Sequence, residues 1–169
     1  MAQPQEQQKT RGVRQVLTSV AEVRAAVIQV TGVANRTLSI FTHDLEPDVY
    51  DHDDFLETLK KFILARTFAR VRVLILEPAR VVLSASRFVE MGRRLNSYIE
   101  FRRVLPHLAG HPEAFFIADE HALVYRARAE TWDGVSDTYE PAVARMYLTK
   151  FESLWNACEI EPEVRRLQI

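Results

Sequence analysis

The sequence has one cysteine, five glycines and no long apolar run. Cys158 cannot form an internal disulfide, and one thiol cannot build a cysteine-rich zinc site, so we interpret it as a core thiol in the aromatic segment 151–155. Apolar runs such as 62–65, and 71–76 apart from Arg72, fall far short of the roughly 20 residues that span a bilayer. We therefore expect no transmembrane helix and no membrane partner.

Glycine-dependent motifs are also missing. The chain contains no G-x-G-x-x-G, no G-x-x-x-x-G-K-[ST] and no G-x-S-x-G, which excludes the usual phosphate cradles and the serine hydrolase elbow. We expect no cofactor. The first ten residues are polar and lack the apolar stretch of a secretory signal, so we expect a flexible leader at 1–15, a single domain at 16–169 and a cytoplasmic location.

The charge is balanced, with 22 basic and 23 acidic side chains. A net charge of -1 gives no general attraction to nucleic acid. The balance is nevertheless a cancellation, because residues 43–59 carry -7 and residues 60–105 carry +8. The +8 segment is either a solvated face of helices and strands or a basic face that holds phosphate.

Periodicity predicts an α/β fold with a mixed, mostly parallel sheet flanked by helices. Ser19-Val-Ala-Glu22 matches a capping box and starts the first helix. Ser84 or Ser86 caps a third helix, and Asp119-Glu-His121 turns a β-hairpin. The predicted helices are 19–31, 55–67, 86–96 and 139–157, and the predicted strands are 37–42, 71–76, 99–104, 114–118 and 122–128.

A sheet of this kind carries its ligand site beyond the carboxyl ends of its parallel strands. That rule places residues 42–45, 77–81 and 104–107 close together. Arg102, Arg103 and Arg126 lie in predicted strands, where a buried charge must be paired or functional. Since neighbouring strand residues point to opposite faces, only one of Arg102 and Arg103 can join Arg126.

Two other groups of polar residues have competing interpretations. His43, Asp44 and His52, with Asp53 or Asp54, offer metal ligands close in sequence, but they also fit an acidic helix N-terminus. His107 and His111 are four residues apart, but the neighbouring proline and glycine favour a loop over a helix that would align them.

The order of elements and the hairpin AFFIADEHALVYRAR resemble the half-domain of the phospholipase D superfamily. In that superfamily an H-x-K-x(4)-D motif lies on the equivalent hairpin, with a histidine nucleophile and a phosphate-holding lysine. Matching Asp119 to the motif's acid puts Pro112 at the histidine position and Ala114 at the lysine position. A shift by one residue offers His111, but then Glu113 stands where lysine is required. The resemblance therefore implies a scaffold without its catalytic pair.

A closer resemblance is to a bacterial, specifically proteobacterial, family of unknown function with a degenerate phospholipase D-like fold, sometimes attached to an acetyltransferase domain. It covers residues 16–169. The histidine that often precedes the third helix in that family is not evident at 84–88. The matching pieces are IFTHDL (40–45), VRVLILEP (71–78), GRRLNSYIEFRRV (92–104), FFIADEHALVYR (115–126), FESLW (151–155) and EVRRL (163–167).

Our leading hypothesis is a non-catalytic binding or regulatory domain, a pseudoenzyme. Arg94, Arg102 and Arg126 would hold an anion or phosphate, while Asp119 orients one of them or closes the hairpin. The partner would be a phosphate-bearing ligand or a protein, and the resemblance implies a homodimer. The alternatives are a metal-assisted hydrolase using His43, Asp44 and His52, and nucleic-acid binding through residues 60–105, which the overall charge disfavours.

Overall fold

Eight strands form one mixed sheet in the computed structural model, which describes residues 11–83 and 86–160. The strand order is β1-β7-β6-β5-β2-β3-β4-β8. Only the central strands β2 (Thr37–Thr42), β3 (Arg70–Ile75) and β4 (Ile99–Arg103) run parallel to one another. The predicted α/β class with a mixed sheet and flanking helices is confirmed, and the antiparallel part is larger than the sequence indicated.

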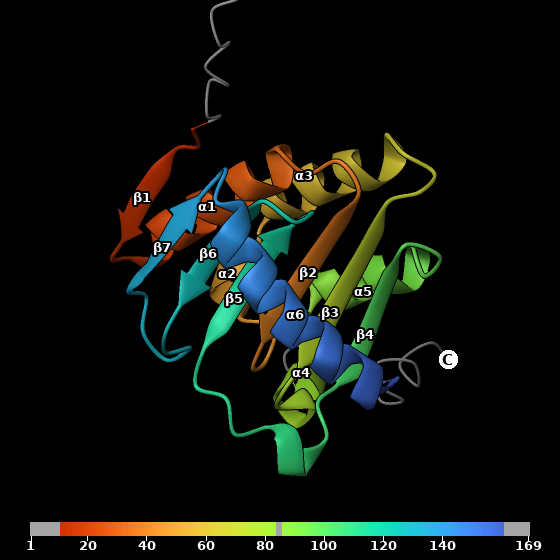
Figure 1. Ribbon diagram of the computed structural model, residues 1–169. Helices are drawn as coiled ribbons and strands as arrows, with labels where there is room; N and C mark the ends of the chain where they lie inside the picture. The colour runs from red at the N-terminus through yellow and green to blue at the C-terminus, as the bar shows by residue number, and fades with distance from the viewer. Residues whose placement is uncertain (1–10, 84–85, 161–169) are drawn as a thin grey trace, which may run out of the picture.

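The other elements surround this parallel centre (Figure 1). The antiparallel strands are β1 (Arg14–Leu17), β5 (Ala114–Ala118), β6 (Ala122–Arg126), β7 (Gly134–Asp137) and β8 (Glu159–Ile160). The helices are α1 (Val20–Gly32), α2 (Pro47–Tyr50), α3 (Asp53–Leu64), α4 (Pro78–Leu83), α5 (Arg87–Arg94) and α6 (Pro141–Ala157), with a 3-10 turn η1 (Pro106–Leu108).

Local sequence signals start the helices as expected. The Ser19 hydroxyl accepts a hydrogen bond from the Glu22 N–H at 3.2 Å, so the capping box begins α1. Ser86 caps α5 by accepting from the Val89 N–H at 3.3 Å. The alternative cap, Ser84, lies outside the described residues.

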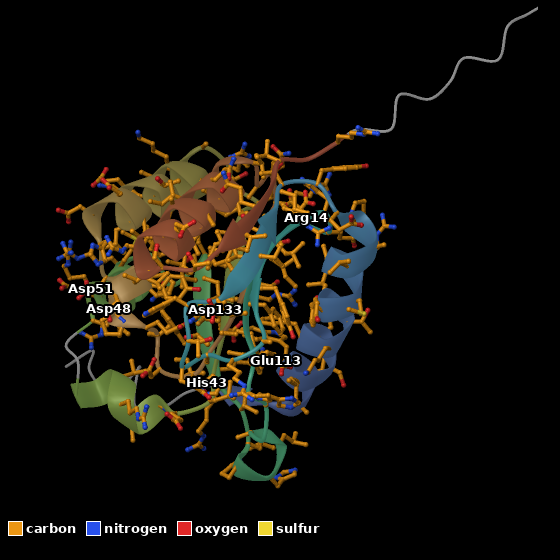
Figure 2. All side chains as sticks on the ribbon, turned by 90° about the vertical axis from the view of Figure 1, so that its left-hand side faces the viewer. Arg14, His43, Asp48, Asp51, Glu113 and Asp133 are labelled. Carbon is orange, nitrogen blue, oxygen red and sulfur yellow. The ribbon has the colours of Figure 1, made fainter. Side chains whose placement is uncertain are left out.

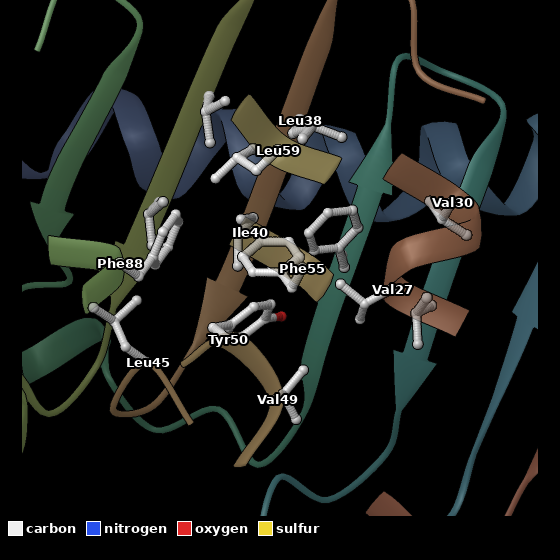
Figure 3. Packing of buried hydrophobic residues seen from close by; sticks show 14 of the residues in the cluster. Val27, Val30, Leu38, Ile40, Leu45, Val49, Tyr50, Phe55, Leu59 and Phe88 are labelled. Atoms are coloured by element: carbon white, nitrogen blue, oxygen red, sulfur yellow. The ribbon is translucent and has the colours of Figure 1, made fainter. Parts of the chain in front are cut away.

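Helices cover both faces of the sheet, so the protein has three layers (Figure 1). Helices α1, α2, α3 and α5 pack on one face over Leu38 and Ile40, with Tyr50, Phe55 and Phe88 in ring contact (Figure 3). Helix α6 covers the other face, where its Phe151 and Trp155 share a buried cluster with Phe41 and Phe115 of the sheet. Alternation along each strand therefore decides which layer a side chain at the end of that strand enters.

Three short strands were not predicted from the sequence. β1 pairs with β7 and includes Arg14 and Gln15, which had been predicted to belong to the flexible leader. β7 follows the turn at Trp132, where only a loop was expected, and the two-residue strand β8 pairs with β4. Residues 1–10 and 161–169, which hold the rest of the leader and the EVRRL match, lie outside the described residues.

No helix in the described part of the chain has the length and apolar character needed to cross a membrane.

Candidate functional site

The carboxyl ends of the three parallel strands meet at one edge of the sheet, which we call the carboxyl edge. The Leu76 N–H donates to the Thr42 carbonyl at 3.1 Å, and the Glu77 N–H donates to the His43 carbonyl at 2.6 Å. The Val104 N–H donates to the Ile75 carbonyl at 2.9 Å. The predicted neighbourhood of 42–45, 77–81 and 104–107 is confirmed. β5 runs antiparallel to β2, so residues 111–113 before it lie at this edge; β6 runs antiparallel to β5 and thus in the direction of β2, so residues 126–133 at and after its end lie there too.

Arg126 is locked into a closed network on the α1 face of the carboxyl edge. Only 3% of it is exposed, and its guanidinium forms an ion pair with Glu46. It also donates to the carbonyls of Ala129 and Thr131, at 3.0 and 2.8 Å, and lies 4.9 Å from the centre of the Trp132 ring. Burial lowers the pKa of Arg126 to about 10, so the side chain stays charged at neutral pH.

The turn that carries Glu46 is conformationally strained. Leu45 and Glu46 have φ of 60° and 24°, values that non-glycine residues rarely adopt. The Asp44 carboxylate accepts from the Glu46 N–H at 3.1 Å, and the Thr42 hydroxyl donates to the Glu46 carboxylate at 3.1 Å. These contacts hold the Glu46 carboxylate against Arg126 of β6, so the strained turn positions Glu46 for the buried ion pair.

A second cluster lies at the same edge on the α6 face. Glu113, just before β5, is buried and pairs with Lys150 of α6. The His111 Nδ1 is 3.8 Å from the Glu113 carboxylate, and its ring meets Phe41 edge-on. His43 and Glu113 both lie at this end of the sheet in Figure 2.

The electrostatics of this second cluster leave it without a net positive charge. Burial lowers the pKa of His111, the nearby Lys150 ammonium and His43 lower it further, and a backbone hydrogen bond at Leu108 partly opposes them. Partial burial also lowers the pKa of Lys150. The lowered pKa of His111 favours its neutral imidazole, and Lys150 is already paired with Glu113. Phosphate would gain little attraction there.

The structure does not bring the three predicted anion-binding arginines together. Arg94 is exposed on α5, where it pairs with Glu90 at 2.6 Å. Arg102 lies 4.2 Å from the centre of the Trp155 ring and donates to the Trp155 carbonyl at 2.9 Å. That places Arg102 on the α6 face of β4, whereas Arg126 lies on the α1 face of β6, and three strands separate the two.

Asp119 lies at the opposite end of the sheet from Arg126 and closes the hairpin. Its φ is 53°, and its two carboxylate oxygens accept the backbone N–H groups of Asn35, Arg36 and Thr37 at 2.7–2.9 Å. Of the two roles proposed from the sequence, the turn role fits these contacts. The side chain ties the β5–β6 hairpin to the start of β2.

The proposed metal ligands are not assembled. Asp53, together with Asp51, pairs with Arg87, and His43 and Asp44 lie at the end of β2 while His52 precedes α3. Within residues 11–83 and 86–160, no group of three or more histidine, cysteine, aspartate or glutamate side chains is arranged to hold a metal ion.

The opposite end of the sheet, which we call the amino edge, carries a groove that the sequence analysis missed. The groove has a volume of about 670 Å³, and hydrogen bonding of the Glu140 N–H to the His121 carbonyl fixes the start of α6 beside it. It is lined by Asn35, Arg36, Thr37, Asp119, Glu120, His121, Tyr139, Pro141 and Arg145. The available signal was a set of arginines near the starts of strands: Arg36 lines the groove and precedes β2, whereas Arg66 lies before β3 and Arg70 is its first residue.

Charge pairing differs between the two edges. Several of the eleven basic residues between Lys60 and Arg103 pair with carboxylates, among them Arg72, Arg80, Arg87, Arg94 and Arg102. In the part of the chain that the structure describes, Arg36, Arg66 and Arg70 at the amino edge form no ion pair. The +8 segment is therefore neither wholly neutralised nor one continuous face.

Solved structures confirm the fold. Nuc from Salmonella typhimurium, described as a phospholipase D family member, matches with a TM-score of 0.62 and 16% identity over 89% of this chain and 98% of that one. NucT from Helicobacter pylori matches with a TM-score of 0.61 and 10% identity over 89% and 99%. At these identities the likeness establishes the fold alone.

A third structure, the archaeal chromatin protein TrmBL2, has a TM-score of 0.62 and 14% identity over 92% of this chain. The chain spans only 56% of that protein, whose description reports a novel mode of DNA binding. No curated protein sequence matches the chain. A family model matches residues 19–167. The chain therefore belongs to the family described as Domain of unknown function (DUF7931) and has a phospholipase D-like fold.

Proposed function

We propose that this chain is a non-cleaving phospholipase D-like domain that binds phosphate-bearing ligands at its amino edge. The observation that carries the proposal is the contrast between the cations inside the two candidate sites. Arg126 and Lys150 at the carboxyl edge are bound to the buried carboxylates of Glu46 and Glu113, whereas Arg36 at the amino edge is exposed and, among the described residues, has no carboxylate partner.

Several features of the carboxyl edge argue against phosphodiester cleavage. A phosphate entering from solvent would meet the Glu113 carboxylate, which occupies the lysine position in the register that retains His111. Lys150 is the nearby ammonium, but its charge is compensated by Glu113. Arg126 is buried and cannot reach a ligand. Because Lys150 is bound to Glu113, His111 lacks a free ammonium that would hold phosphate on the way to a phosphohistidine.

The proposal therefore places the anion site at the amino edge and not at the arginines predicted from the sequence. Arg102, Arg126 and Asp119 have their polar groups engaged within the protein, and exposed Arg94 pairs with Glu90. The proposal keeps the homodimer, which rests on the resemblance of the fold to half-domains that pair. Light scattering of the purified chain tests it, and a monomeric mass at all concentrations would remove it.

Two assays on the full chain test the proposal. Calorimetric titration with pyrophosphate should show binding that Arg36→Ala weakens at least fivefold and Arg128→Ala leaves unchanged. Arg128 is the matched control, since it is an exposed arginine near the carboxyl edge. A phosphodiester such as bis(4-nitrophenyl) phosphate should not be turned over. Turnover that disappears in His111→Ala, or no pyrophosphate binding at millimolar concentration, would contradict the proposal.

A further inference from the structure

The arginines of the amino edge form a group through neighbouring backbone. The Arg70 N–H donates to the Arg36 carbonyl at 3.0 Å, and Thr37 and Arg70 are register partners in β2 and β3. Arg66 reaches the same place from the turn before β3, because its guanidinium donates to the Asn35 amide oxygen at 3.3 Å. Arg36 therefore lines the groove, and Arg66 and Arg70 lie next to it through their contacts with Asn35 and Arg36.

Arg145 supplies a fourth cation from the α6 wall of the groove. Its partner, Glu120, lies 3.7 Å away, and both side chains are about two-thirds exposed, at 65% and 68%. An ion pair this exposed contributes little stability and exchanges readily. A phosphate can therefore replace the Glu120 carboxylate at low cost.

The one carboxylate fixed inside the groove is Asp119. Both of its oxygens accept backbone N–H groups, which compensate part of its charge and hold it against β2. Inside the groove, Arg36 and Arg145 therefore stand with two carboxylates, one compensated by the backbone and one exposed and exchangeable. Arg66 and Arg70 add positive charge beside Arg36, although the Arg70 guanidinium also donates to the Thr67 and Ala69 carbonyls.

Aromatic rings lie among these arginines. Tyr139 lines the groove with 38% of its surface exposed, and its ring lies 5.8 Å from that of His121. Phe68 is 58% exposed in the turn between Arg66 and Arg70. The Tyr98 ring lies 5.9 Å from the Arg70 guanidinium. An exposed phenylalanine between two arginines lacks a packing role, whereas a nucleobase can stack on it.

We propose that the amino-edge groove binds single-stranded nucleic acid, with arginines on successive phosphates and Tyr139 and Phe68 under unpaired bases. This inference rests on the proposed function, because it names the class of phosphate-bearing ligand. Stacking on aromatic rings requires bases that are not paired, which favours a single strand over a duplex. A phosphopeptide would use the arginines but would leave the exposed rings unexplained. A flat membrane surface would not reach the groove walls.

Fluorescence anisotropy with a labelled 12-nucleotide oligothymidylate tests the inference on the full chain. The single strand should bind at least fivefold more tightly than a 12-base-pair duplex. With four arginines on phosphates, the logarithm of affinity should fall with the logarithm of salt concentration with a slope of about -3.

Substitutions separate the contribution of the arginine charges from the contribution of base stacking. Arg36→Glu and Arg70→Glu should each weaken oligothymidylate binding at least tenfold, and Tyr139→Ala about tenfold through lost stacking. Arg128→Glu, the same charge change near the opposite edge, should change affinity less than twofold. Melting temperatures close to that of the wild type confirm that the variants are folded.

The possible outcomes are distinguishable. Binding of pyrophosphate without binding of the oligonucleotide overturns this inference and leaves the proposed function standing, whereas binding of neither overturns both. A loss of oligonucleotide affinity in Arg128→Glu as large as in Arg36→Glu overturns the placement in the groove. Binding to phosphatidylserine vesicles in place of the oligonucleotide also overturns it, because the ligand is then a membrane.

Discussion

Arg126 and Glu46 form a buried ion pair that joins the end of β6 to the strained turn after β2. The two residues are 80 positions apart in the sequence, and their side chains are only 4% and 8% exposed. The pair holds together two strands that are not neighbours, since β5 lies between β2 and β6. The carboxyl edge is thereby closed by charges that serve the fold.

Removing one member of this pair should be costly. Glu46→Ala leaves the Arg126 guanidinium buried without its carboxylate, and such changes typically destabilise a protein by about 3–5 kcal/mol. Chemical denaturation monitored by circular dichroism measures the loss.

The double variant Glu46→Gln/Arg126→Met provides the control, because it removes both charges together. It should be less destabilised than Glu46→Ala. Equal stability of Glu46→Ala and the wild type would show that Arg126 reaches solvent and is available to a ligand.

Asp119→Ala should destabilise the protein by about 2–4 kcal/mol, since three backbone N–H groups lose their acceptor and alanine tolerates a φ of 53° poorly. Asp119→Asn keeps one oxygen and the residue type that accepts this conformation, so we expect about half that loss. Thermal unfolding compares the two. An equal loss in the two variants would argue that the carboxylate charge itself is the important feature, because both variants remove it.

His111 should make stability depend on pH. Folding lowers its pKa from 6.5, so the unfolded chain binds the proton more tightly than the folded chain. The stabilising difference is present above pH 6.5 and is lost as the pH falls below that value. His111→Gln should therefore lose less melting temperature than the wild type between pH 7.5 and 5.

His107→Gln is the matched control for this pH dependence, since it changes an exposed imidazole beside the same loop. It should retain the wild-type loss on acidification. If His107→Gln and His111→Gln behave alike, the burial of His111 does not govern the acid sensitivity.

Elements with strong local signals were predictable from the sequence. The capping box at Ser19 begins α1, and the two apolar segments that flank Asp119-Glu-His121 form the β5–β6 hairpin. The sites of contact at the ends of β2, β3 and β4 followed from the rule that parallel strands share a carboxyl edge. These predictions needed only periodicity and topology.

The short strands were not predictable in this way. β7 has the sequence GVSD, which begins with glycine and includes two polar residues, and β8 has two residues. Their pairing depends on β6 and β4, which are already in the sheet, and not on their own propensity.

The site could be predicted only in part, because the partners of its side chains lie far away in the sequence. The sequence shows that Arg126 and Arg102 must find partners, but Glu46 and Trp155 lie 80 and 53 positions away. Such pairings depend on which face each strand presents and on a turn with positive φ at Glu46. The amino-edge groove likewise joins a loop, a hairpin tip and a helix start from three parts of the chain.

The most direct test of the central claim is a map of ligand binding by nuclear magnetic resonance. Amide spectra of the labelled chain titrated with pyrophosphate report which edge of the sheet receives the phosphate. We predict shifts concentrated at Asn35, Arg36, Thr37 and the hairpin tip at 119–121, with His43, His111 and Glu113 unaffected. Shifts concentrated at His43, His111 and Glu113 would contradict the account and return the ligand to the carboxyl edge.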